Sequence, residues 1–148
     1  MKVGRTARGV ESAGTEARSR RNGAKRILVV DDDEIARQLN ADMLSRYGYE
    51  TQTAEDGAAA WEALQANGYD LLITDNNMPK VSGVELIRKL RSARMALPVV
   101  LASGAIPTEA MNSNSPLQLA ALLLKPFTLD ELLAIVKKVL CATTVPAS

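Results

Sequence analysis

Residues 27–34 read ILVVDDDE, so four apolar residues are followed directly by four acids. A short apolar run without polar alternation is typical of a strand buried on both faces of a parallel sheet. The next residues have helical spacing, and Gly48 is placed to end the helix. The apolar positions expected to form the inner face of this helix are Ile35, Ala36, Leu39, Met43 and Leu44. The regular part of the chain therefore starts with a strand and a helix.

The same alternation of apolar runs and helical periods continues along the chain. Further strands are expected at residues 49–54, 69–74, 98–102 and 122–124, and further helices at 58–66, after Ser82 and after Thr128. Ser82 with Glu85, and Thr128 with Glu131, have the spacing of capping boxes. Strict alternation predicts an α/β fold, namely a flavodoxin-like (βα)5 doubly wound parallel sheet with strand order 2-1-3-4-5.

Residues 106–119 are the weakest part of this pattern. The alternation requires a fourth helix here, but residues 112–116 read NSNSP, which is unfavourable for a helix. We expect a short, irregular or mobile fourth helix.

The composition is that of an ordinary globular domain, with 148 residues of which 47% are apolar and 24% charged. No apolar run approaches the roughly 18 residues of a membrane span. The chain has no histidine, which excludes His-based triads and His-ligated zinc or haem. Its single cysteine, Cys141, excludes an internal disulfide framework. With no export signal and one thiol, the expected compartment is the cytoplasm.

Charge divides the chain into a basic arm and an acidic domain. Residues 1–26 carry eight Lys or Arg and two acids, a net charge of +6, whereas residues 27–148 carry ten and fifteen, a net charge of −5. Residues 1–24 hold too few apolar side chains to offset the entropy of ordering, so we expect a disordered basic arm there. The domain is expected at residues 25–141 and a short tail at 142–148. The arm fits contact with nucleic acid or an acidic partner, or simple solvation.

Polar side chains gather at the expected carboxyl ends of the strands. Asp31 and Asp32 follow the first strand, Asp75 the third, Ser103 the fourth and Lys125 the fifth. Doubly wound sheets place their sites at this edge, so these groups are expected to share one crevice. Unpaired carboxylates so close together repel one another, and an all-oxygen site suits Mg²⁺. A carboxylate can also act as a nucleophile, and Mg²⁺ neutralises charge on a phosphoryl group in transfer.

In these segments the sequence resembles the receiver domains of two-component response regulators, over residues 25–141. The resemblance rests on LVVDD at 28–32, DLLITDNNMP at 70–79, SGVE at 82–85, LASG at 101–104 and KPF at 125–127. Each motif is weak alone, but an acid pair, an isolated aspartate, a hydroxyl and a Lys-Pro pair, each at a strand end and in this order, are together highly specific.

The resemblance implies a role for each polar group of the crevice. Asp75 would accept a phosphoryl group from a phosphohistidine on a sensor histidine kinase or a histidine phosphotransferase. Lys125 would pair with Asp75 and later with a phosphoryl oxygen, and Ser103 would turn inward to bind the phosphoryl group. The Lys125–Pro126 peptide bond would be cis.

The resemblance also implies a set of Mg²⁺ ligands. Asp32 and Asp75 would bind the ion through carboxylate oxygens, Asn77 through its backbone carbonyl and Asp31 through a water molecule. Asp33, with Glu34 after it, is instead expected to complement the dipole of the first helix.

A domain of this family is a signalling module rather than an enzyme. Phosphorylation would switch a surface that binds an output protein of unknown identity, or a homodimer would form through the face of the fourth helix, fifth strand and fifth helix. About seven residues follow the last helix, so we expect no DNA-binding domain in this chain, and no membrane contact.

Two features depart from the family pattern and keep alternatives open. Leu122 stands where many receivers have Tyr or Phe, and the fourth helix is degraded. We therefore expect signalling by ordering or disordering of residues 105–119. A pseudo-receiver scaffold that binds its partner without phosphorylation is one alternative. A remote one is a Mg²⁺-dependent phosphatase of the haloacid-dehalogenase type, suggested by Asp31-x-Asp33, although Pro126-Phe127 stand where that family needs acids.

Overall fold

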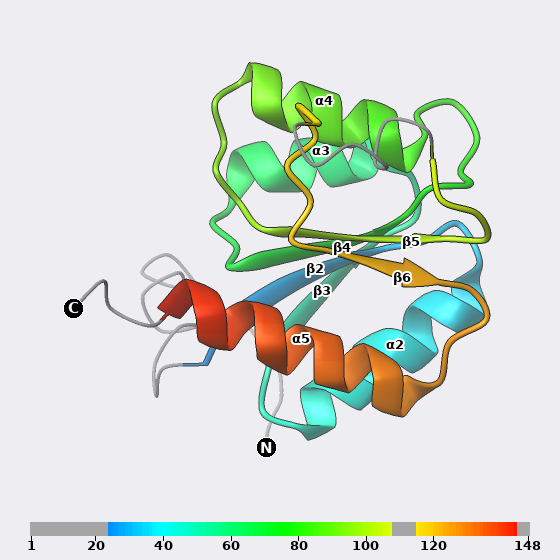
Figure 1. The fold of residues 1–148 in the computed structure, drawn as a ribbon, viewed down its shortest axis with the longest axis vertical. Coiled ribbons are helices and arrows are strands. Elements are labelled where there is room, and N and C mark those ends of the chain that lie inside the picture. Colours follow the sequence, from blue (N-terminus) through cyan, green and yellow to red (C-terminus); the bar gives the residue numbers. More distant parts are fainter. Residues whose placement is uncertain (1–23, 108–114, 145–148) are drawn as a thin grey trace.

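The computed structural model describes residues 24–107 and 115–144, which form five strands and four helices (Figure 1). The strands are β2 (Arg26–Val30), β3 (Glu50–Ala54), β4 (Leu71–Asp75), β5 (Val99–Ser103) and β6 (Ala121–Leu124). The helices are α2 (Glu34–Arg46), α3 (Gly57–Ala66), α4 (Gly83–Ser92) and α5 (Leu129–Thr144). The expected strands and these four helices are confirmed, with small shifts of their ends.

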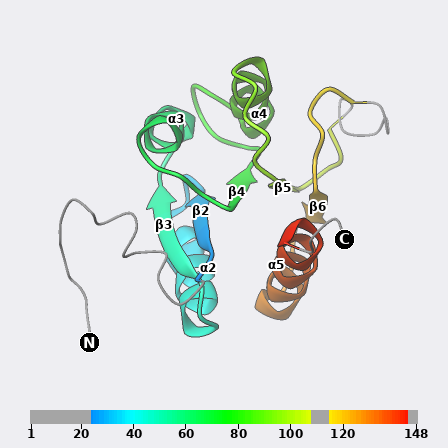
Figure 2. The ribbon, with the colours of Figure 1, turned by 90° about the vertical axis from the view of Figure 1, so that its left-hand side faces the viewer.

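The strands form one parallel sheet in the order β3-β2-β4-β5-β6, which is the predicted doubly wound order. Helices α2 and α5 cover one face of the sheet, and α3 and α4 cover the other (Figure 2). In the register of the sheet, Val30 is opposite Thr74, Asp75 is opposite Ala102, and Ser103 is opposite Leu124. The polar residues at the strand ends therefore follow one another along a single edge.

Side-chain caps determine where the helices begin. Asp33 Oδ1 accepts hydrogen bonds from the backbone N–H groups of Ile35 at 3.0 Å and Ala36 at 3.4 Å, so Asp33 is the N-cap of α2. The two predicted capping boxes are present at the starts of α4 and α5. Gly48 lies just beyond α2 with a φ of 95°, a conformation that glycine adopts at low cost.

Two apolar clusters, one on each face, hold the helices to the sheet. The cluster below α3 and α4 includes Leu28, Leu72, Leu86, Ile87, Leu90 and Leu101. The cluster below α2 and α5 includes Ile27, Val29, Leu44, Ile73, Leu132 and Val136. Because alternate residues of a strand point to opposite faces, β2 and β4 supply side chains to both clusters. This burial on both faces explains why these strands are apolar without interruption.

The inner face of α2 differs from the prediction. Ile35 is 72% exposed and Leu39 52% exposed, although both were expected in the core. The buried residues of α2 are Asn40, Ala41 and Leu44, so the helix is rotated toward a less apolar face. Leu44 is buried as expected, but the prediction was wrong for Ile35 and Leu39, because the buried face of α2 instead holds the small Ala41 and the polar Asn40.

Between β5 and β6, the described residues 104–107 and 115–120 contain no helix. Leu117 fills the space below α4 and is only 1% exposed. The Arg91 guanidinium donates to the carbonyl oxygens of Met95, Leu97, Leu117 and Gln118, at 2.8–3.0 Å. This clamp ties residues 117–118 to α4 and to the turn that follows it. A short, irregular or mobile fourth helix was expected here, and the centre of that segment, residues 108–114, lies outside the described residues.

Several predictions concern residues outside the described part. The basic arm was expected at residues 1–24, of which 1–23 lie outside the described residues, as do the end of the tail at 145–148 and the centre of the expected fourth helix at 108–114. Within the described residues, no helix combines the length and apolar character needed to cross a membrane.

Candidate functional site

Three carboxylates meet at the carboxyl edge of the sheet. Asp31 and Asp32 follow β2, and Asp75 is the last residue of β4. One carboxylate oxygen from each lies within 4.8 Å of the others. Asp31 is 5% and Asp75 3% exposed, whereas Asp32 is open to solvent. The structure therefore contains the predicted convergence of these three acids at one edge of the sheet.

Asp31 is held by the loop that follows β2. Its Oδ1 accepts a hydrogen bond from the Asp33 backbone N–H at 2.9 Å. Burial raises the pKa of the Asp31 carboxyl, and the charges of Asp75 and Asp32 act in the same direction. The Asp33 hydrogen bond and the charge of Lys125 lower this pKa without cancelling the rise. The folded protein thus holds the Asp31 carboxyl in surroundings that disfavour its negative charge.

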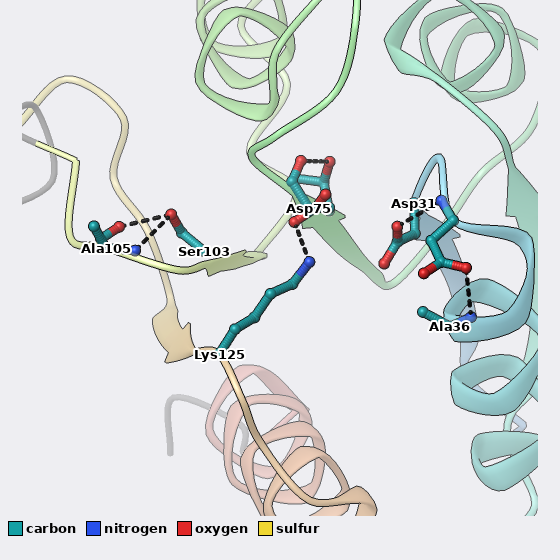
Figure 3. Close-up of polar contacts among 8 residues, drawn as sticks. Asp31, Ala36, Asp75, Ser103, Ala105 and Lys125 are labelled. Carbon is teal, nitrogen blue, oxygen red and sulfur yellow. Dashed lines mark hydrogen bonds and ion pairs between the residues drawn. The ribbon is translucent and has the colours of Figure 1, made fainter.

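Lys125 reaches these carboxylates from the end of β6. Its Nζ lies 2.7 Å from Asp75 Oδ1 (Figure 3). Partial burial by itself lowers the pKa of Lys125, but the hydrogen bond to Asp75 and the charges of Asp75, Asp31 and Asp32 outweigh it and raise the pKa. The ammonium is therefore firmly charged, and one cation faces three carboxylates.

Ser103 and Asn77 lie at the same edge, but neither side chain bonds Asp75. The Ser103 hydroxyl donates to the Ala105 carbonyl oxygen at 2.6 Å, and Figure 3 shows it directed toward Ala105. It also accepts from the Ala105 N–H at 3.3 Å. Asn77 is exposed in the loop after β4. The Lys125–Pro126 peptide bond is cis, as expected.

The start of α4 packs directly against the end of β4. Asn76 Oδ1 accepts from the Val84 N–H at 3.0 Å, and the Asn76 carbonyl accepts from the Gly83 N–H at 3.2 Å. A β-carbon on Gly83 would lie 2.5 Å from the Asp75 carbonyl oxygen. Asp75 is therefore positioned by α4 as well as by its own strand.

The donor set suits a hard divalent cation. Asp31, Asp32 and Asp75 offer carboxylate oxygens, and the cluster includes neither sulfur nor imidazole. Oxygen ligands with excess negative charge are those that Mg²⁺ prefers. The residues of the crevice thus fit the metal expected from the sequence.

One residue that contacts the site was missed in the sequence. Arg37 Nη1 donates to the Asp31 carbonyl oxygen at 2.8 Å. A cation near the start of a helix opposes the helix dipole. The position of this arginine, four residues after the N-cap of α2, could therefore have indicated that it binds a group outside the helix.

Asp31→Asn is expected to increase the stability of the metal-free protein at pH 7. The pKa of Asp31 is raised on folding, so its charge opposes folding at neutral pH. As pH falls through the folded pKa toward the unfolded one, Asp31 is protonated and the advantage of the variant disappears. Urea unfolding at pH 7 and pH 4 measures this difference, and a variant no more stable than wild type at pH 7 would contradict it.

Comparison with known proteins identifies relatives of this chain. The family model described as "Response regulator receiver domain" matches residues 27–137. The sensor histidine kinase RcsC of Salmonella typhi is 39% identical over 106 residues, which are 72% of this chain and 11% of RcsC. The chain thus spans about a tenth of the length of this relative.

Solved structures agree with this match. The receiver domain of the Francisella response regulator 1452 has a TM-score of 0.74 and 30% identity, covering 81% of this chain and 99% of that one. The response regulator TrrA of Thermotoga maritima, solved in complex with Mg²⁺-BeF, has a TM-score of 0.68 and 35% identity. That match covers 78% of this chain and 98% of TrrA.

Proposed function

The chain belongs to the response regulator receiver family, and we propose on that basis that it accepts a phosphoryl group on Asp75 in a two-component phosphorelay. Receiver domains are signalling modules rather than members of a classical enzyme family. The observation that carries the proposal is the buried Asp75 carboxylate, 2.7 Å from the Lys125 ammonium and grouped with Asp31 and Asp32.

The proposed reaction moves the phosphoryl group from a histidine nitrogen to a carboxylate oxygen. An Asp75 carboxylate oxygen attacks phosphorus, and the new O–P bond forms as the N–P bond to the donor imidazole breaks. The imidazole nitrogen keeps the electron pair and takes up a proton. Lys125, now paired with the carboxylate, is placed to hold a phosphoryl oxygen of the acyl phosphate.

Mg²⁺ would be held by Asp31, Asp32, Asp75 and the Asn77 carbonyl. When bound, it supplies positive charge that offsets the charge of the carboxylates and of the incoming phosphoryl group. The fit rests on the all-oxygen donor set and on the raised pKa of the Asp31 carboxyl. TrrA, of the same family, was solved in complex with Mg²⁺-BeF.

Ser103 would report the phosphorylated state. Its hydroxyl now bonds Ala105, in the loop that leaves β5. Turning toward a phosphoryl group on Asp75 requires both bonds to Ala105 to break. Phosphorylation would thereby release residues 104–107, which is where the expected signalling segment begins.

The proposal is tested by intact-mass spectrometry after incubation with acetyl phosphate. With Mg²⁺ we expect a single phosphoryl adduct, and with a chelator we expect none. Borohydride reduction followed by peptide mapping should place the acyl phosphate on Asp75. A folded protein that takes no adduct under any condition would instead support the pseudo-receiver alternative, which the aliphatic Leu122 favours.

The exposed stripe on α2 is the proposed contact for the phosphodonor. Ile35 and Leu39 lie one turn apart on α2 and Tyr47 caps its carboxyl end, and all three are more than half exposed. Helix α2 begins right after Asp31 and Asp32, so a donor that brings phosphohistidine to Asp75 passes over its first turns. Apolar side chains at such a position suit a helical histidine-containing domain.

Ile35→Ser combined with Leu39→Ser is therefore expected to lower phosphotransfer from a cognate sensor kinase roughly ten- to a hundredfold, because two apolar contacts are lost. Labelling by acetyl phosphate is expected to stay unchanged. Gln38→Ser on the same helix is the matched control. Equal loss with both donors would show that the stripe affects the site itself rather than docking.

A further inference from the structure

Asp31 is fixed at each of its backbone groups and at its carboxylate. Its N–H donates to the Ala54 carbonyl at 3.2 Å, and its Oδ1 accepts from the Asp33 N–H at 2.9 Å. Its carbonyl oxygen accepts from Arg37 Nη1 at 2.8 Å. The first two hydrogen bonds have main-chain partners, the Ala54 carbonyl of β3 and the Asp33 N–H of the loop. The third depends on one side chain, so substitution can test it.

Arg37 reaches this carbonyl from the fourth residue of α2. Side chains of a helix lean toward its amino terminus, which carries the guanidinium back over the loop at residues 31–33. A hydrogen bond from a charged donor is stronger than one between neutral groups. The carbonyl belongs to a residue that is 5% exposed and its hydrogen bond is partly buried, so losing the donor removes a charged partner from that oxygen.

The position of Arg37 is compatible with a cation in the crevice. An arginine paired with the Asp31 carboxylate would compete with a metal for the same oxygens. Arg37 instead binds the main-chain oxygen and leaves the carboxylate oriented by the Asp33 N–H. Its charge opposes the dipole of α2, so helix stability alone does not account for an arginine at this position.

We propose that Arg37 is a positioning residue of the acidic site, which holds the β2–α2 loop so that the Asp31 carboxylate faces Asp32 and Asp75. This inference rests on the proposed function, because it assigns Arg37 to the Mg²⁺-dependent step. Arg37 touches neither the phosphoryl group nor the ion. It acts through Asp31.

The test compares Arg37→Gln with wild type, using Mg²⁺ alone as the probe. The Mg²⁺ dissociation constant, obtained from the Mg²⁺-dependent shift of the unfolding midpoint, is expected to rise about tenfold, as for other residues that orient metal ligands. In metal-free protein, hydrogen exchange at the Asp33 amide is expected to accelerate. Arg46→Gln removes the same charge from the other end of α2, and it should change neither quantity more than about twofold.

Arg37→Lys keeps the charge and is expected to recover part of the Mg²⁺ affinity, which covers the case in which Arg37→Gln fails to fold. The inference is overturned if a folded Arg37→Gln protein binds Mg²⁺ as tightly as wild type, with unchanged exchange at the Asp33 amide. It is also overturned if Arg46→Gln weakens Mg²⁺ binding equally, because a general loss of stability in α2, rather than loss of the bond to Asp31, would then explain the effect. Failure of the proposed function looks different, since wild type itself would then show no Mg²⁺-dependent stabilisation.

Discussion

Replacing Asp75 by asparagine is expected to abolish labelling of this chain by acetyl phosphate. The carboxylate supplies the electron pair that forms the O–P bond, and an amide oxygen is a far weaker nucleophile. Asparagine preserves the size and planar shape of the side chain in a site that is only 3% exposed. The adduct detected by intact-mass spectrometry in the presence of Mg²⁺ should therefore fall to background, while the fold remains.

Asp42→Asn is the matched control, because it makes the same substitution on the exposed part of α2. It should be labelled like wild type. A folded Asp75→Asn protein that still takes up a phosphoryl group would show that another carboxylate is the acceptor. Peptide mapping would then distinguish Asp31 from Asp32, the two carboxylates next to Asp75 in the crevice.

The second large effect is expected from Gly83→Ala. The added β-carbon would lie 2.5 Å from the Asp75 carbonyl oxygen and 2.9 Å from Asn76 Cα. These are backbone atoms, so the strain is relieved only by moving the start of α4 away from the end of β4. Overpacking of this kind costs about 3 kcal/mol of the free energy of unfolding. Urea denaturation measures the loss, and acetyl phosphate labelling should slow as well, because Asp75 moves.

Gly68→Ala provides the comparison for Gly83→Ala. A β-carbon on Gly68 has no atom within 4 Å, so that substitution is expected to leave stability within about 0.5 kcal/mol of wild type. Equal stabilities of the two variants would contradict the close approach of α4 to β4.

The sheet could be predicted because its buried strands are apolar runs that are visible in the local sequence. Residues 27–30 and 71–73 are apolar without interruption, and an acid follows the first run directly and the second after Thr74, a pattern that is typical of buried parallel strands with a polar carboxyl end. The same pattern placed Asp31, Asp32 and Asp75 at one edge. Lys125 was placed there by its position after the last strand, and its bond to Asp75 agrees with that expectation.

The errors and omissions arise from tertiary contacts. The inner face of α2 was predicted from hydrophobicity, but the sheet accepts Asn40 and leaves Ile35 in solvent. Arg91 binds carbonyl groups 26 and 27 residues further along the chain, and no local pattern encodes such a contact. The sequence contains only a weak indication of the role of Arg37, which is a positive charge near the start of a helix. The structure explains this charge, because the guanidinium binds the Asp31 carbonyl.

The central place of β2 has a consequence for the order of events during folding. β2 is the first described strand in the chain, yet it lies between β3 and β4. Residues 26–75 can therefore pair into three adjacent strands before β6 is added, and this gathers Asp31, Asp32 and Asp75 while Lys125 is still absent. Mutual repulsion then opposes early association of β2 with β4. Refolding is accordingly expected to accelerate as Mg²⁺ or salt is added. The added ions reduce the repulsion between the carboxylates, as the Lys125 ammonium does once β6 has joined the sheet.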